Sequence, residues 1–233
     1  MLKNLGKLVV GLLAAFSLSG CGVYQLNQRT NPTKVSMNSQ NTQGEFERKL
    51  ALKYTAEIQE LLSRLTPGTD YDKGVAPSGD RYSIGFFTPN HSIQTAPLNS
   101  DEPIYFGSAI ISGSIYNRNR TTFAERASTV FVNHAKDYLS AALSASGAEM
   151  QNDPRVRGLF VSLTWGLNDR IDDFSAMTAT YGEALKICAD WASTQKFVNN
   201  QISAQEFADG VIVIGFYNGK ELGKIKIDTQ KLL

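Results

Sequence analysis

The chain has 233 residues, of which 42% are hydrophobic, a proportion sufficient for one well-packed domain. Its 23 basic and 22 acidic residues give a formal net charge of +1, and this balance excludes a broad basic surface for nucleic acid. Of its two cysteines, Cys21 lies close to the N-terminus, and Cys188 alone cannot form an internal disulfide in the rest of the chain.

Residues 1–20 have the pattern of an export signal. Lys3 and Lys7 provide a positive start, and an uncharged apolar run follows from Leu8 to Leu18. This run is too short to cross the ~30 Å hydrocarbon core of a bilayer, which requires about 20 residues. An ordinary signal peptidase also fits poorly, because a cut before Cys21 would place Leu18 where a small side chain is needed.

The four residues Leu18-Ser19-Gly20-Cys21 resemble the lipobox of bacterial lipoproteins. The resemblance implies cleavage between Gly20 and Cys21, a diacylglyceryl thioether on Cys21 and, in many bacteria, acylation of the new amino terminus, for example with palmitate. Two or three acyl chains on one residue anchor a protein stably in membrane lipid. Two alternatives stay open, namely a secreted protein in which Cys21 is incidental and a cytosolic protein with a buried first helix.

Residues 21–44 form the expected disordered tether between the lipidated cysteine and the domain. From Gly22 to Gly44, 13 of 23 residues are Asn, Gln, Ser or Thr, without a periodic apolar face. A coil of this length reaches about 25 to 30 Å. Because Gly22 is not Asp, the lipoprotein resemblance implies sorting to the outer membrane, facing the periplasm, if the host is Gram-negative.

Residues 45–66 are expected to form one long helix. Apolar residues recur at three- and four-residue steps, and Pro67-Gly68 ends the pattern. The stripe consists of Phe46, Leu50, Tyr54, Ile58, Leu61 and Leu65. We expect it to pack on the domain's own sheet, the alternative being a partner helix.

The middle of the chain predicts two strands and a second long helix. The strand segments are "RYSIGFFTP" and "EPIYFGSAIISGSIY", which are rich in Ile, Phe, Tyr and Ser. Thr122 and Glu125 have the spacing of a capping box at a helix start, and Gly147 is expected to close this helix.

The last third of the chain predicts a mixture of strands and short helices. Residues 156–165 alternate in the manner of a half-buried strand, and residues 178–189 favour a strand over a helix. A short helix is expected at residues 190–199, and a second begins at the Ser203–Glu206 capping box. Asn218-Gly219 between two apolar runs predicts a type I′ hairpin.

Together these elements predict a single α+β domain over residues 45–233. Its antiparallel or mixed sheet packs against two long helices and ends in a C-terminal β-hairpin.

The candidate metal ligands are sparse. His91 and His134 are the two histidines, and neither has a second histidine or a carboxylate at metal-ligand spacing. Asp70, Asp72 and Gly74 match the start of a calcium loop, but no Glu follows at the twelfth position, which favours a solvated turn. We therefore predict no metal site, and the missing glycine-rich phosphate motifs predict no cofactor.

The candidate reactive groups are equally scattered. Cys188 lies in an apolar segment, so a buried, inert thiol is favoured over pairing with a partner's thiol. Two charged clusters are read first as solvated loops, with acid–base catalysis and anion binding, respectively, as the alternatives. They are Asp169, Asp172 and Asp173 around Arg170, and the group of Arg118, Arg120 and Arg126.

These observations favour a lipid-anchored envelope lipoprotein that is a non-enzymatic binding or assembly component. Its expected partners are membrane lipid, through acylated Cys21, and an envelope protein, with no nucleic acid. The alternatives are an envelope hydrolase that acts on cell-wall or lipid substrates and a surface-exposed lipoprotein that contacts the host or environment.

Overall fold

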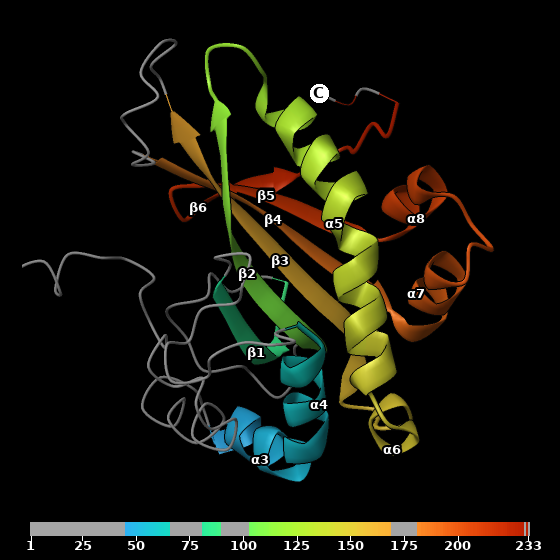
Figure 1. The fold of residues 1–233 in the computed structure, drawn as a ribbon. Coiled ribbons are helices and arrows are strands. Elements are labelled where there is room, and N and C mark those ends of the chain that lie inside the picture. The colour runs from blue at the N-terminus through green and yellow to red at the C-terminus, as the bar shows by residue number, and fades with distance from the viewer. Residues whose placement is uncertain (1–44, 66–80, 90–102, 169–180, 231, 233) are drawn as a thin grey trace, which may run out of the picture.

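A mixed β-sheet organises the domain (Figure 1). The computed structural model describes residues 45–65, 81–89, 103–168, 181–230 and 232. These residues form one six-stranded sheet whose strands lie in sequence order from β1 to β6. All neighbouring strands are antiparallel except β2 and β3, which are parallel. The strands are β1 (Arg81–Phe87), β2 (Ile104–Asn117), β3 (Val156–Asn168), β4 (Tyr181–Asp190), β5 (Ile212–Tyr217) and β6 (Lys220–Lys224).

Helices cover one face of this sheet. The long helix α5 (Phe123–Ala145) crosses β2, β3 and β4, and the short helix α6 (Ala148–Gln151) leads from it into β3. Figure 1 shows α3 and α4 beside one end of α5, with α7 and α8 along its other side. The predicted α+β class, single domain and mixed sheet are confirmed.

The predicted first long helix is interrupted. The structure has α3 (Glu45–Lys53) and α4 (Thr55–Leu65), with Tyr54 between them. The Thr55 hydroxyl donates to the carbonyls of Ala51 and Leu52, and this competition with backbone amides bends helices. The expectation of one continuous helix is therefore wrong. The stripe from Leu50 to Leu65 nevertheless packs inside the domain, against β1 and α5, as expected.

The start of α5 follows the sequence pattern, and its end does not. Thr122 and Glu125 form the predicted capping box, with Thr122 N–H donating to Glu125 Oε2 at 2.8 Å. The helix ends at Ala145, followed by Ser146 in an extended conformation. Gly147 precedes α6 with φ −74, so it is not the left-handed closing residue that was expected.

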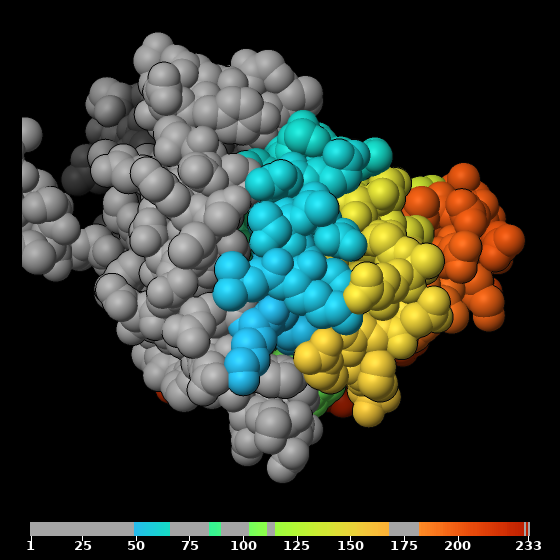
Figure 2. Space-filling view, turned by 90° about the horizontal axis from the view of Figure 1, so that it is seen from below, coloured from blue at the N-terminus to red at the C-terminus, as the bar shows by residue number. Residues whose placement is uncertain are grey.

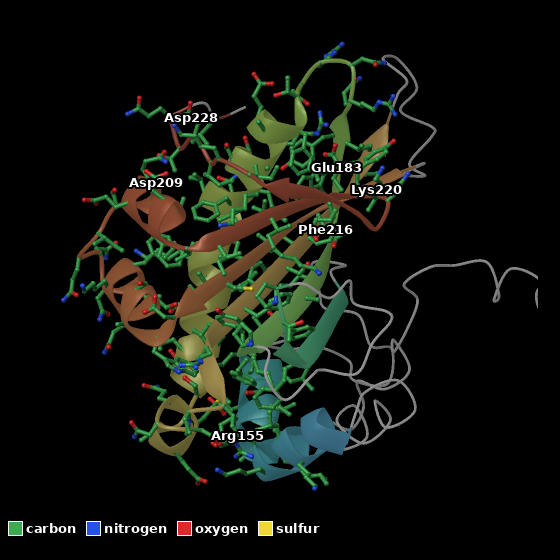
Figure 3. All side chains as sticks on the ribbon, turned by 180° about the vertical axis from the view of Figure 1, so that it is seen from behind. Arg155, Glu183, Asp209, Phe216, Lys220 and Asp228 are labelled. Carbon is green, nitrogen blue, oxygen red and sulfur yellow. The ribbon has the colours of Figure 1, made fainter. Side chains whose placement is uncertain are left out.

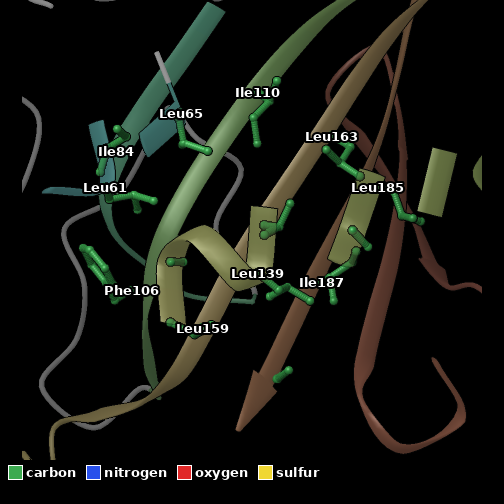
Figure 4. Packing of buried hydrophobic residues seen from close by; sticks show 14 of the residues in the cluster. Leu61, Leu65, Ile84, Phe106, Ile110, Leu139, Leu159, Leu163, Leu185 and Ile187 are labelled. Carbon is green, nitrogen blue, oxygen red and sulfur yellow. The ribbon is translucent and has the colours of Figure 1, made fainter. Parts of the chain in front are cut away.

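Strand β3 is buried on both sides, whereas the sequence predicts a half-buried strand. Leu159, Val161, Leu163 and Trp165 face the helices and join the main core, part of which Figure 4 shows. Phe160 and Ser162 point to the opposite side and are also buried. That side holds a second, smaller apolar cluster of Tyr105, Ala109, Phe160 and Cys188. Alternation alone did not distinguish this central strand from a half-exposed one.

The C-terminal elements match their predictions. Residues 181–190 form the favoured strand β4, and residues 191–198 form the short helix α7 (Trp191–Val198). Helix α8 (Ala204–Gly210) begins at the Ser203–Glu206 capping box. Asn218 and Gly219 both have positive φ, 47 and 77, as a type I′ turn between β5 and β6 requires. Among the described helices, none has the length and apolarity that a membrane crossing needs.

Candidate functional site

Several predicted site residues lie outside the described part of the chain. They are the lipobox residues 18–21 with Gly20 and the proposed lipidation site Cys21, the tether, Asp70, Asp72 and Gly74, His91, and the group from Asp169 to Asp173. The predictions made for these residues therefore remain predictions.

The described candidates do not converge on one place. His134 lies in the middle of α5, with the Tyr138 ring 6.3 Å away, whereas Cys188 lies on the sheet face away from the helices. Burial raises the pKa of the Cys188 thiol to about 12, so the buried, inert thiol is the reading that the geometry favours. Arg118 and Arg120 are exposed, as expected, and Arg118 donates to the Tyr217 hydroxyl at 3.2 Å.

Arg126 corrects the expectation of a solvated arginine cluster, because it is buried in an ion pair. Its Nε donates to Glu183 Oε2 at 2.8 Å and its Nη2 to Glu183 Oε1 at 2.7 Å. Trp165 Nε1 donates to the same Oε2 at 2.8 Å, and Arg126 Nη1 donates to the Thr121 carbonyl and hydroxyl. Figure 3 labels Glu183 among the side chains at this end of the sheet.

This buried pair joins the start of α5 to strand β4. Bidentate pairing and the indole hydrogen bond satisfy the carboxylate, so the arrangement holds the fold and offers no free base. The sequence did contain a signal. Glu183, Leu185 and Ile187 alternate along the strand, so their side chains lie on the same face of the sheet. Arg126 lies next to Ala127 on the apolar face of its helix. Two opposite charges at inward positions indicate a buried pair.

A lysine lies on the sheet face opposite the helices. Lys186 is 3% exposed, and its ammonium lies 4.2 Å from the centre of the Phe216 ring. Burial lowers the pKa of Lys186 to about 8. Ser162, its register partner on β3, has a buried hydroxyl with no hydrogen-bond partner among the described residues.

A partly accessible polar cluster centres on a buried carboxylate, Asp153, between α6 and β3. The Tyr54 hydroxyl donates to Asp153 Oδ2 at 2.6 Å, and Lys53 Nζ donates to the same oxygen at 3.3 Å. Arg155 Nε donates to Oδ1 at 2.8 Å, and Arg155 Nη2 donates to Oδ2. The Arg155 hydrogen bond, more than any other contact, holds the pKa of Asp153 well below its usual range.

A shallow hollow of about 440 Å³ opens beside this cluster. It is lined by Lys53, Glu149, Asn152, Asp153, Pro154 and Arg155. Glu149 accepts from Lys53 Nζ at 2.8 Å, and this contact is the first cause of a raised Lys53 pKa. The hollow therefore presents two half-exposed cations, Lys53 and Arg155, that share the buried Asp153 carboxylate, and Lys53 is also paired with the exposed Glu149.

We expect Asp153→Asn to lower the free energy of unfolding by about 2 kcal/mol at pH 7, because hydrogen bonds to a charged group are lost. The pKa of Asp153 is depressed in the folded state, so this stability is present above the unfolded pKa of about 4 and is lost as pH falls below it. The difference between wild type and variant should therefore shrink at pH 3.

Urea unfolding at pH 7 and at pH 3 measures this difference. Asp137→Asn, at an exposed site on α5, is the control and should change little at either pH. A wild-type advantage that stays constant or grows on acidification would contradict the assignment of Asp153 as the charged acceptor.

Among the described residues, no group of three or more His, Cys, Asp or Glu side chains is placed to hold a metal ion. Comparison with protein-family models, with curated proteins and with solved structures finds no match for this chain. Functional inference therefore depends on the residues themselves.

Proposed function

We propose that this chain is a lipid-anchored bacterial envelope lipoprotein that serves as a binding or assembly component. The observation that carries the proposal is the sequence Leu18-Ser19-Gly20-Cys21, which directly follows an apolar run preceded by two lysines. A cysteine at this position supplies the thiol that a thioether-linked lipid requires. Acyl chains on Cys21 then hold the protein in the cell envelope, at the outer membrane and facing the periplasm in a Gram-negative host.

A binding role agrees with how the described domain uses its charged groups. Glu183 and Arg126 form a buried ion pair, and Cys188 is a buried thiol whose pKa is raised. The exposed charges near the hollow are those of Lys53, Glu149 and Arg155. Tethering keeps such a surface at a high effective concentration near other envelope components, which suits an adaptor or a subunit of a larger assembly.

Metabolic labelling with an alkyne fatty acid tests the anchor. We expect the wild-type protein to incorporate the label and Cys21→Ala to lose it, since the thiol is the attachment point. Cys188→Ala is the matched control and should keep the label, because Cys188 is buried in the sheet. Mass spectrometry of the mature amino terminus locates the modification. Retention of label by Cys21→Ala, or an unmodified amino terminus, would overturn the anchor.

Crosslinking in intact cells tests the binding role. A photo-crosslinker placed near the hollow should capture a defined envelope component in the wild-type cell. Failure of every exposed position on the domain to give a discrete product would count against an assembly role.

A further inference from the structure

The end of the domain that carries α3 has an exposed apolar side chain directly before one of the cations of the hollow in the sequence. Leu52 is 48% exposed, although it lies in a helix whose neighbouring Leu50 and Ala51 are buried. Lys53 follows it directly. Figure 2 shows α3 and α4 side by side with the segment around α6 on this face of the molecule. The segment that follows Cys21 joins the domain here, because α3 begins at Glu45.

The buried Asp153 carboxylate orients the two cations beside the hollow. Lys53 and Arg155 have side chains that are 39% and 42% exposed, and both donate to Asp153, whose side chain is 4% exposed. A buried anion under two half-exposed cations limits their rotamers without covering them. Ordering of this kind reduces the entropy that binding would otherwise cost.

Glu149 occupies the outer side of Lys53. Its carboxylate lies 2.8 Å from Lys53 Nζ, and its side chain is 73% exposed, so water surrounds most of it. Exposed ion pairs of this type are weak and exchange readily. The carboxylate thus stands where an external oxyanion would contact the lysine, and it can be displaced without uncovering the core.

We propose that this face, which carries Lys53 and Arg155 at the hollow and the exposed Leu52 next to Lys53 in the chain, docks on the anionic phospholipid surface of a bilayer. A headgroup phosphate replaces the Glu149 carboxylate on Lys53 and contacts Arg155, while Leu52 enters the interfacial region. The inference deepens the proposed function, because the anchor on Cys21 would bring this end of the domain within reach of the membrane. Each contact is individually weak, and the anchor supplies the local concentration.

The test uses the chain from residue 21 onward with Cys21→Ser, which keeps every described residue and removes acylation. An environment-sensitive fluorophore on Leu52→Cys reports insertion into vesicles, since Cys188 is buried and resists labelling. Leu222→Cys on β6 is the matched control, because Leu222 is 47% exposed and lies at the other edge of the sheet. We expect emission to rise at position 52 only, and with phosphatidylglycerol vesicles rather than phosphatidylcholine vesicles.

Vesicle flotation of the unlabelled protein tests the residue assignment. Lys53→Gln and Arg155→Gln should each weaken partitioning about five-fold, whereas Glu149→Gln should strengthen it by a similar factor. Arg64→Gln and Glu60→Gln are the controls, because these residues form an ion pair on α4 in which Arg64 is as exposed as Arg155. Equal partitioning into neutral vesicles, no response at position 52, or equal effects of the controls would overturn the proposal. Labelling of Cys21 is measured separately, so failure of the anchor and failure of the docking surface are distinguishable.

Discussion

Glu183→Gln is expected to lower the free energy of unfolding by about 3 to 5 kcal/mol, the largest effect of any single charge substitution in the described domain. The variant leaves the Arg126 guanidinium buried without a counter-charge, and an uncompensated buried charge is strongly destabilising. The shape of the side chain is preserved, so loss of packing contributes little. Denaturant unfolding at neutral pH measures the change.

Two companion variants separate charge from packing. Glu60→Gln removes an exposed carboxylate paired with Arg64 and should cost less than about 1 kcal/mol. Combining Glu183→Leu with Arg126→Met removes both buried charges and should recover much of the loss, because hydrophobic replacement of a whole buried pair is often nearly neutral. A Glu183→Gln variant as stable as Glu60→Gln would show that the pair does not hold α5 to the sheet.

Gly107→Ala should be one of the most damaging glycine substitutions in the sheet, with an expected cost of about 3 kcal/mol or more. A Cβ at Gly107 would lie 1.8 Å from the carbonyl oxygen of Phe160, which belongs to the neighbouring backbone and cannot move without separating β2 from β3. Urea unfolding, with circular dichroism to confirm the fold, measures the effect.

Gly85 provides a matched control in the same sheet. It pairs with Gly107 in register across β1 and β2, yet a Cβ at Gly85 would have no atom within 4 Å. Gly85→Ala should therefore leave stability unchanged or raise it slightly, since alanine restricts the unfolded chain. Similar losses at both positions would mean that strand propensity, rather than close backbone approach, determines the need for glycine.

The sequence predicts the described elements well where the signal is local. Capping boxes at Thr122 and Ser203, the turn at Asn218-Gly219 and the periodicity of the strands all involve residues within a few positions of one another. Local patterns did not predict the interruption at Tyr54. At that point the Thr55 hydroxyl donates to the carbonyls of Ala51 and Leu52, and the Tyr54 hydroxyl donates to Asp153, which lies far away in the chain.

The polar clusters required contacts between distant segments. Arg126 and Glu183 meet only because α5 crosses β4, and Lys53 meets Asp153 only because α3 lies beside the turn before β3. Nothing in the amino-acid composition distinguishes these residues from ordinary surface charges. For Arg126, the inward position on its helix was a usable signal. For Asp153, the segment "NDPRVRG" fits an ordinary turn as well as it fits a buried polar cluster.

The parallel pairing of β2 with β3 has a consequence for the order of folding. A two-residue turn joins β5 to β6, whereas α5 and α6 lie between β2 and β3 in the chain. Closing such a long loop is slow relative to forming a hairpin. An N-terminal portion that ends before β3 lacks the central partner of its sheet. We therefore expect an N-terminal portion that ends before β3 not to fold stably by itself.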